Sequence, residues 1–274
     1  MTKIRYGMVG GGPGAFIGKV HRGGIALDTS ADLVAGAFSR SESKNVQFGE
    51  ELGISADRCY KDYQAMAAGE KDREDGIDFV VIVTPNNTHY EIAKTFLEAG
   101  INVSCDKPLC VSVEQAKELQ ALAKEHDLLF MVTFTYTGYS LVRYLAQYIQ
   151  DGQIGEIRTI MAEYPQQSQA VPRVAGKKVN WRNDITQNGG TNCLGDIGVH
   201  IMALSHMMTG LKTQKVLAQM EMLAPDSQLD DNDYVMVKYD NGASGMYWAS
   251  KIALGNGNGL KIRIYGSKGA VTWE

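Results

Sequence analysis

Three polar side chains, distant from one another along the chain, are of the types that the oxidation of an alcohol requires. They are Lys107, Asp196 and His200. Removing a hydride from a secondary alcohol needs a group that accepts the hydroxyl proton, and histidine suits this because its pKa lies near neutrality. A nearby ammonium stabilises the charge that develops on the alcohol oxygen, and a carboxylate can orient the histidine or hold a second hydroxyl. These residues are therefore candidates for a catalytic site.

Spacing alone leaves a plainer interpretation open for the same residues. Asp196 and His200 are four residues apart, so on a helix they share one face and can converge on one point. Such a pair is, however, more often a helix-start carboxylate with an ordinary histidine, and a single lysine such as Lys107 is more often a solvated side chain. The elements that surround the three residues must decide between the two interpretations.

The first half of the chain alternates strand patterns with helix patterns. The predicted strands are 4–9, 33–38, 79–83, 101–105 and 128–132, and the predicted helices are 16–27, 43–53, 90–99 and 112–126. This alternation predicts βαβ units and a parallel sheet that helices cover on both faces. Lys107 follows one of the strands, and open α/β sheets bind ligands at the carboxyl ends of their strands.

The pattern changes near residue 155, where strands joined by short turns begin. The predicted strands are 156–164, 215–223, 234–239, 243–250 and 260–265, and one strong helix is predicted at 196–208. Asn241-Gly242 is a hairpin signal between two of the strands. The fold class is therefore an α/β Rossmann domain followed by an α+β domain with a mostly antiparallel, open sheet. With the boundary at the predicted helix 139–150, the domains are 1–138 and 139–274.

The first strand ends in a glycine-rich loop, Gly10-Gly-Gly-Pro-Gly-Ala15, and a helix follows it. In this context glycines let the backbone approach a pyrophosphate, and the helix N-terminus offers free N–H groups and positive partial charge. A tight structural turn uses the same residues, but the position at the start of a βαβ repeat favours dinucleotide binding. If Gly18 is the third glycine, the loop is longer than the minimal motif. The predicted cofactor contacts are Gly10, Gly12, Gly14, Ala15, Phe16 and Ile17.

Ser39-Arg40 stands at the end of the second predicted strand, where an acidic residue usually binds the adenosine ribose. A hydroxyl and a guanidinium suit the 2′-phosphate of NADP instead, because a guanidinium pairs bidentately with phosphate. The alternative is a surface arginine in a polar turn. The sequence predicts NADP or NAD as the cofactor and modestly favours NADP.

Composition excludes several other functions. The 274 residues carry a net charge of −4, so no basic face for nucleic acid is expected. No apolar run is long enough to span a bilayer, and no signal peptide is evident, so a cytoplasmic protein without membrane contact is expected. The four cysteines form no C-x-x-C pair and no zinc-like cluster, so no metal is expected to polarise the substrate.

Six ordered motifs resemble the Gfo/Idh/MocA family, named after glucose-fructose oxidoreductase, inositol dehydrogenase and a rhizopine-catabolism protein. The resemblance runs from the first predicted strand to the last residue. Its carriers are Val9-Gly-Gly-Gly12, Thr84-Pro-Asn-Asn-Thr-His89, Cys105-Asp-Lys-Pro-Leu109, Trp181-Arg182, Gly195-Asp-Ile-Gly-Val-His200 and Gly266-Ser-Lys-Gly269.

The resemblance assigns roles to the three candidate catalytic residues. It implies that His200 accepts the proton, that Lys107 positions the substrate hydroxyl and that Asp196 supports the site. It also implies a set of residues that border the cofactor, chiefly its nicotinamide half: Thr84, Pro85, Asn86, His89, Asp106 and Lys107.

Thr133-Phe-Thr-Tyr136-Thr-Gly-Tyr139 resembles a subgroup that includes levoglucosan dehydrogenase-like enzymes. Tyr136, Tyr139 and Arg182 become candidates to contact a polyhydroxylated substrate together with Lys107, Asp196 and His200. Packing at the domain junction is the alternative for the two tyrosines. By the same resemblance we expect a homo-oligomer formed through the open face of the second domain's sheet.

Two features depart from the family pattern. Many members carry a glutamate where this chain has Asp106, which is a small change. Relatives of this type continue beyond a segment like 266–273, whereas this chain stops at Glu274. We therefore expect a C-terminally shortened second domain.

The sequence thus predicts an NAD(P)-dependent dehydrogenase that acts on a ring hydroxyl of a sugar, anhydrosugar or cyclitol. Two alternatives stay open. One is a glycosidase-like enzyme that oxidises its substrate transiently in order to eliminate and cleave a glycosidic bond. The other is a non-catalytic dinucleotide sensor or co-regulator, which would not need to keep a proton acceptor such as His200.

Overall fold

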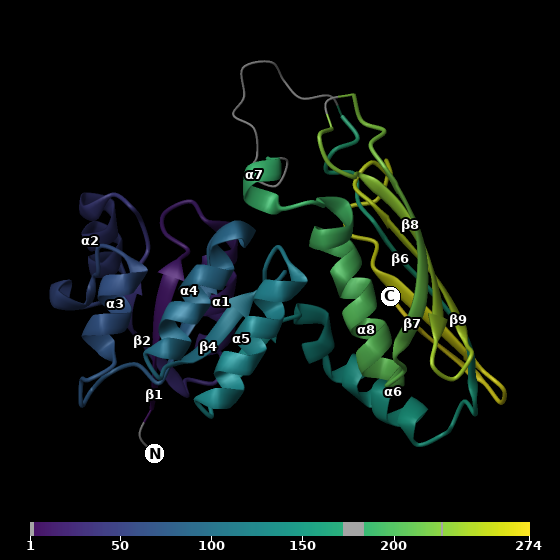
Figure 1. The fold of residues 1–274 in the computed structure, drawn as a ribbon, viewed down its shortest axis with the longest axis horizontal. Coiled ribbons are helices and arrows are strands. Elements are labelled where there is room, and N and C mark those ends of the chain that lie inside the picture. Colours follow the sequence, from purple (N-terminus) through teal and green to yellow (C-terminus); the bar gives the residue numbers. More distant parts are fainter. Residues whose placement is uncertain (1–2, 172–183, 226) are drawn as a thin grey trace. The chain divides into compact units, whose positions relative to one another are not determined.

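The computed structural model describes residues 3–171, 184–225 and 227–274 (Figure 1). The chain divides into two units, Met1–Thr133 and Phe134–Glu274. The predicted boundary at 138/139 falls after the short helix η3 (Thr135–Gly138), which belongs to the second unit. This helix contacts α6 (Ser140–Gln150) and α8 (Val199–Thr209), which are both helices of the second unit.

The first unit is built on five strands whose apolar side chains lie in the interior. The strand order is β2-β1-β3-β4-β5, and every neighbouring pair is parallel. The strands are β1 (Ile4–Gly10), β2 (Ala31–Ala37), β3 (Phe79–Val83), β4 (Asn102–Asp106) and β5 (Phe130–Thr133). This confirms the predicted parallel Rossmann sheet. The topological switch point lies between β1 and β3, which is where such sheets bind ligands.

Helices cover both faces of this sheet, because alternate side chains of β3 pack into core clusters on opposite faces. Val80 and Ile82 pack into one core cluster with α4, whereas Val81 and Val83 pack into a second with α1 and α2. The helices are α1 (Phe16–Ala26), α2 (Glu42–Glu51), η1 (Ala56–Arg58), α3 (Tyr63–Glu70), η2 (Asn86–Thr88), α4 (His89–Glu98) and α5 (Val113–Glu125). The short helix α3 was not predicted from the sequence pattern.

The second unit contains a six-stranded sheet of order β11-β10-β6-β9-β8-β7. The strands are β6 (Ile157–Pro165), β7 (Thr213–Glu221), β8 (Asn232–Tyr239), β9 (Ser244–Ser250), β10 (Lys261–Gly266) and β11 (Ala270–Trp273). Among the described strands of this second sheet, only the β6–β9 pair is parallel, so the predicted mostly antiparallel sheet is confirmed. The last strand, β11, was not predicted.

Helices α6 and α8 cover one face of this sheet (Figure 1). Val142 on α6 and Leu204 on α8 are fully buried in the same core as Ile160 on β6. The helix predicted at 196–208 begins earlier, as a wide π-helical turn η5 (Leu194–Gly198) that continues into α8. A short helix α7 (Ile185–Asn188) precedes it. Among the described residues, no helix combines the length and apolar character that a bilayer crossing requires.

Candidate active site

The glycine loop between β1 and α1 is shaped by close backbone approaches. A Cβ atom on Gly12 would lie 2.6 Å from the carbonyl oxygen of Phe38, and one on Gly18 would lie 2.4 Å from the Cα of Gly11. Gly18 therefore acts as the third glycine of the motif, because only a glycine lets α1 pack this closely on the loop. The predicted contacts Gly10, Gly12, Gly14, Ala15, Phe16 and Ile17 all lie in this loop or in the first helical turn.

The loops after β3 and β4 carry the other predicted cofactor residues, and His89 joins them. Its ring nitrogens lie 2.8 Å from the carbonyl oxygen of Pro108 and 2.9 Å from that of Thr84. The side chain is buried, and this burial lowers the pKa of His89. His89 thus bridges the loops that follow β3 and β4. Its predicted contact with the nicotinamide stays a prediction, as do those of Thr84, Pro85 and Asn86.

Asp106 ends β4 and precedes Lys107, which is half-buried. Burial opposes ionisation of Asp106, but His21, whose Nε2 lies 3.8 Å from Oδ1, and Lys107 outweigh it, so the pKa of Asp106 lies below its ordinary value. Thr133 Oγ1 also donates a hydrogen bond to this carboxylate at 3.2 Å. His21, on α1, was missed in the sequence analysis because it belongs to no recognised motif.

Ser39 and Arg40 follow β2, as predicted. Arg40 is exposed, and no ion pair of its guanidinium is found within the described chain. Ser39 Oγ accepts a hydrogen bond from the backbone N–H of Ser41 at 3.2 Å. Both interpretations of the pair, a 2′-phosphate site and a polar surface turn, stay open.

Asp196 and His200 lie on one continuous helical run in the second unit, Asp196 in η5 and His200 in α8. The N-terminus of this run is capped from a distance by Asp230. Its carboxylate accepts hydrogen bonds from the backbone N–H groups of Asn192 at 2.6 Å and Leu194 at 2.7 Å. A carboxylate is the preferred partner of these otherwise unpaired N–H groups. The cap therefore fixes the start of the helix that carries both candidate residues.

Aromatic side chains surround the buried His200. The Tyr136 ring meets the imidazole edge-on, with centroids 5.0 Å apart, and the Tyr136 hydroxyl lies 2.6 Å from that of Tyr164. Burial, followed by the Tyr136 hydrogen bond, raises the pKa of Tyr164. Asn258 bonds to both hydroxyls. Tyr136 is thus part of a polar network beside His200, which the sequence analysis did not foresee.

Tyr139, the other predicted substrate tyrosine, is half-exposed and packs edge-on against the Trp273 ring at 5.9 Å. The structure supports a packing role here and leaves the substrate contact as a prediction. Arg182 lies outside the described residues.

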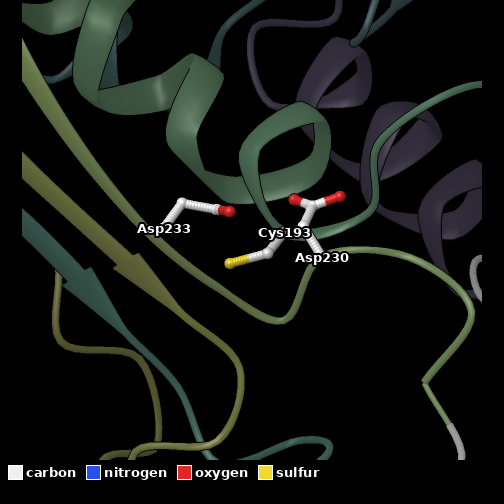
Figure 2. Close-up of side chains that lie close together, drawn as sticks. All are labelled: Cys193, Asp230 and Asp233. Carbon is white, nitrogen blue, oxygen red and sulfur yellow. The ribbon is translucent and has the colours of Figure 1, made fainter. Parts of the chain in front are cut away.

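Behind the helix start, Cys193, Asp230 and Asp233 are buried with potential ligand atoms within 4.8 Å of one another, and their side chains converge (Figure 2). Burial raises the pKa of the Cys193 thiol, and burial together with Asp230 raises the pKa of Asp233 to about 8. Asp230 is already occupied by the helix cap. We therefore interpret the cluster as a structural pocket, and the expected absence of a catalytic metal stays a prediction.

The sequence-predicted residues thus divide between the two units. Asp196 and His200 belong to the second unit, where η5 and α8 carry them, and Lys107 belongs to the first. The meeting of all three beside one substrate stays a prediction. Asp196 has a further partner that was not predicted, because Lys251 forms an ion pair with it at 2.9 Å.

Comparisons with known proteins match both units. Residues 4–134 match the Gfo/Idh/MocA oxidoreductase family, NAD-binding Rossmann fold, and residues 142–272 match the Gfo/Idh/MocA C-terminal domain. The uncharacterized oxidoreductase YfiI of Bacillus subtilis is 38% identical, over 98% of this chain and 70% of its own length. The levoglucosan dehydrogenase of Pseudarthrobacter phenanthrenivorans is 27% identical, over 100% of this chain and 74% of its own length.

A solved structure is similar over nearly the whole chain. It is the inositol dehydrogenase homolog from Azotobacter vinelandii, which is 36% identical; the match covers 99% of this chain and 71% of the NAD+ complex's chain or 70% of that of the NADH complex. The TM-score is 0.95 for its complex with NAD+ and 0.92 for its complex with NADH and myo-inositol.

Proposed function

We propose that this chain, which belongs to the Gfo/Idh/MocA family of oxidoreductases with an NAD-binding Rossmann fold, transfers a hydride between a nicotinamide cofactor and a ring hydroxyl of a sugar, anhydrosugar or cyclitol. The chain is a dehydrogenase that acts on CH–OH groups. The observation that carries the substrate class is the likeness to the Azotobacter vinelandii homolog, which was solved with NADH and myo-inositol.

The residues of this chain divide the chemistry between them. Bound nicotinamide supplies the hydride acceptor. His200 takes the hydroxyl proton, and its burial among aromatic rings keeps competing water away. Lys107 holds the reacting hydroxyl and stabilises negative charge on its oxygen, and Asp196 orients His200 or a second substrate hydroxyl.

The first unit fits a dinucleotide. A Cβ atom on Gly12 would collide with the Phe38 carbonyl and one on Gly18 with the Gly11 backbone, and α1 begins after its N-cap residue Ala15 without a side-chain cap. Free N–H groups at such a turn bind a pyrophosphate.

We expect NAD to bind and NADP to bind better, with Arg40 on the 2′-phosphate. Arg40→Ala should raise the KM for NADP about tenfold and leave that for NAD nearly unchanged.

The open face of the second unit's sheet favours association of two copies. Leu217, Met236 and Met246 lie side by side across β7, β8 and β9, and they are 69%, 59% and 45% exposed. A contiguous apolar face of this kind marks an interaction site. We infer a homo-oligomer, which Met236→Glu should dissociate in sedimentation experiments.

The test is a panel of sugars, anhydrosugars and cyclitols assayed with NAD and NADP by nicotinamide absorbance. Stoichiometric reduction of the cofactor supports the dehydrogenase. Turnover without net reduction indicates the transient oxidation and elimination of a glycosidic bond. Tight NADH binding in calorimetry with no turnover across the panel would overturn the proposal in favour of a dinucleotide sensor.

A further inference from the structure

Lys251 is a lysine in the interior of the second unit, directly after the last residue of β9. Only 3% of its side chain is exposed. Its ammonium nitrogen lies 2.9 Å from Oδ2 of Asp196 and donates a hydrogen bond to Oδ1 of Asn192 at 2.5 Å. Its backbone N–H donates to the carbonyl of Asp231 at 2.8 Å. The side chain therefore starts from a fixed backbone and ends on the residues that begin the η5–α8 helix.

Burial makes this ion pair different from the other lysine pairs among the described residues. Taking an ammonium out of water costs several kcal/mol, which only close partners offset. Lys261 pairs with Glu274 at the surface, where each side chain keeps contact with water, and such pairs contribute little to stability. A lysine held in the interior against Asp196 thus imposes a defined position on that carboxylate.

Asp196 and Lys251 differ in how far their side chains are exposed to solvent. The side chain of Asp196 is 18% exposed and that of Lys251 is 3% exposed. A molecule approaching from solvent can therefore contact the carboxylate, whereas the ammonium supports it from the interior. The second hydrogen bond, to Asn192, anchors the ammonium to the segment whose backbone Asp230 caps.

We propose that Lys251 is a positioning residue of the active site, which keeps Asp196 ionised and fixes its orientation toward the substrate and His200. This inference rests on the proposed function, because it assigns to Asp196 a part in the reaction. Lys251 itself does not touch the substrate.

The charges around the pair give the direction of the expected pH effect. His200 follows Asp196 on the same helical run, and Cys193, Asp230 and Asp233 lie around the helix start. Removing a positive charge makes protonation of every neighbouring group easier. Asp196 and His200 must both be unprotonated to act, so the acidic limb of the pH profile of kcat should move to higher pH without Lys251.

The experiment compares Lys251→Met with Lys261→Met. The second variant is the matched control, because it removes a lysine that is paired at the surface. We expect Lys251→Met to lower kcat by about 10- to 100-fold and to move the acidic limb up by roughly one pH unit. NADH affinity should be unchanged, because that site belongs to the first unit. Lys261→Met should change neither kcat nor the pH profile. A purely structural role would lower the melting temperature and the active fraction without moving the limb, and that result would overturn the inference.

A double-variant comparison covers the case in which Lys251→Met does not fold. Asp196→Asn together with Lys251→Met removes both charges of the pair, so that neither partner is left as a buried charge without the other. If Lys251 acts through Asp196, this double variant should have the kcat of Asp196→Asn alone, within about twofold. A further tenfold loss would contradict the inference. Full activity of Asp196→Asn would refute the part in the reaction that is assigned to Asp196, and with it this inference. Lack of turnover by the unmodified protein across the substrate panel would instead refute the proposed function, so the two failures are distinguishable.

Discussion

The two units carry their parts of the site in different ways. In the first unit, the predicted cofactor residues lie in loops directly after strands, and His89 holds two of these loops through Thr84, five residues earlier, and Pro108, 19 residues later. In the second unit, Asp196 and His200 lie on a helical run that is supported by residues much farther along the chain. Asp230 caps it from 38 residues away, and Lys251 reaches Asn192 across 59 residues.

This difference follows from the architecture of each unit. A parallel sheet brings its strand ends to one edge, so short loops suffice to gather ligand contacts there. A helix packed across an antiparallel sheet has no such edge, and its orientation depends on polar groups that the sheet supplies. Substitutions in the first unit should therefore affect cofactor binding locally, whereas distant substitutions in the second should affect turnover.

The largest expected effect is that of His200→Ala. Loss of the proton acceptor should lower kcat by about 10²- to 10⁴-fold, while NADH affinity stays nearly unchanged. His206→Ala, on the same helix and exposed, is the matched control and should retain activity. Steady-state kinetics with an identified substrate measure the first effect, and calorimetry measures the second. Unchanged turnover of His200→Ala would show that the assignment of the proton acceptor is wrong.

Removal of the distant cap comes next. Asp230→Ala leaves buried N–H groups at the helix start unpaired, so the free energy of unfolding should fall by about 2 kcal/mol and kcat should fall with it. Asp62, which caps α3 in the first unit through a bond from Ala65 N–H at 2.7 Å, is the matched control. Asp62→Ala should cost about 1 kcal/mol and leave kcat unchanged. Equal kcat values for Asp230→Ala and Asp62→Ala would contradict the expected difference between the two units.

A pair of alanine substitutions in α1 tests the glycine loop. Gly18→Ala should destabilise the protein by about 1–3 kcal/mol and weaken NADH binding, because its Cβ would collide with Gly11. At Gly23, in the same helix, a Cβ meets nothing within 4 Å, so Gly23→Ala should stabilise by up to about 1 kcal/mol. Chemical denaturation and NADH titration measure both. Tight NADH binding by Gly18→Ala would contradict the role of the third glycine.

The smallest expected effect concerns pH and Asp233, whose pKa is raised to about 8. Because the folded protein holds this proton more tightly than the unfolded chain, the stability gained is full below about pH 4 and is lost as the pH rises to 8. Asp233→Asn should therefore melt several degrees above the unmodified protein at pH 8, and this difference should shrink as the pH falls to 5. Scanning calorimetry at both values checks this, with the exposed Asp72→Asn as control. A difference that does not depend on pH would contradict the raised pKa.

The fold could be predicted largely from sequence, because most of its helices and strands follow from residue patterns within their own segments. The β-branched run of β3 was predicted with its observed bounds, and Asn241-Gly242 marks the β8–β9 turn. Short elements such as α3, α7 and β11 escaped prediction, since each offers too few residues for its periodicity to stand out. The helix start at residue 194 was placed too late, because the N-cap residue Cys193 makes no side-chain cap and Asp230 caps the wide turn η5 from a distance.

By itself, the sequence determined the order of the elements, the glycine loop and the residue types that oxidation of an alcohol requires, because backbone conformation and hydrophobic alternation are local properties of the chain. Only the tertiary structure decided what holds the second unit's candidates: the Asp230 cap, the Tyr136–Tyr164 network and the ion pair of Asp196 with Lys251. No spacing rule connects these residues. Their partnership follows from burial, which forces polar groups from distant segments to pair with one another because water cannot reach them.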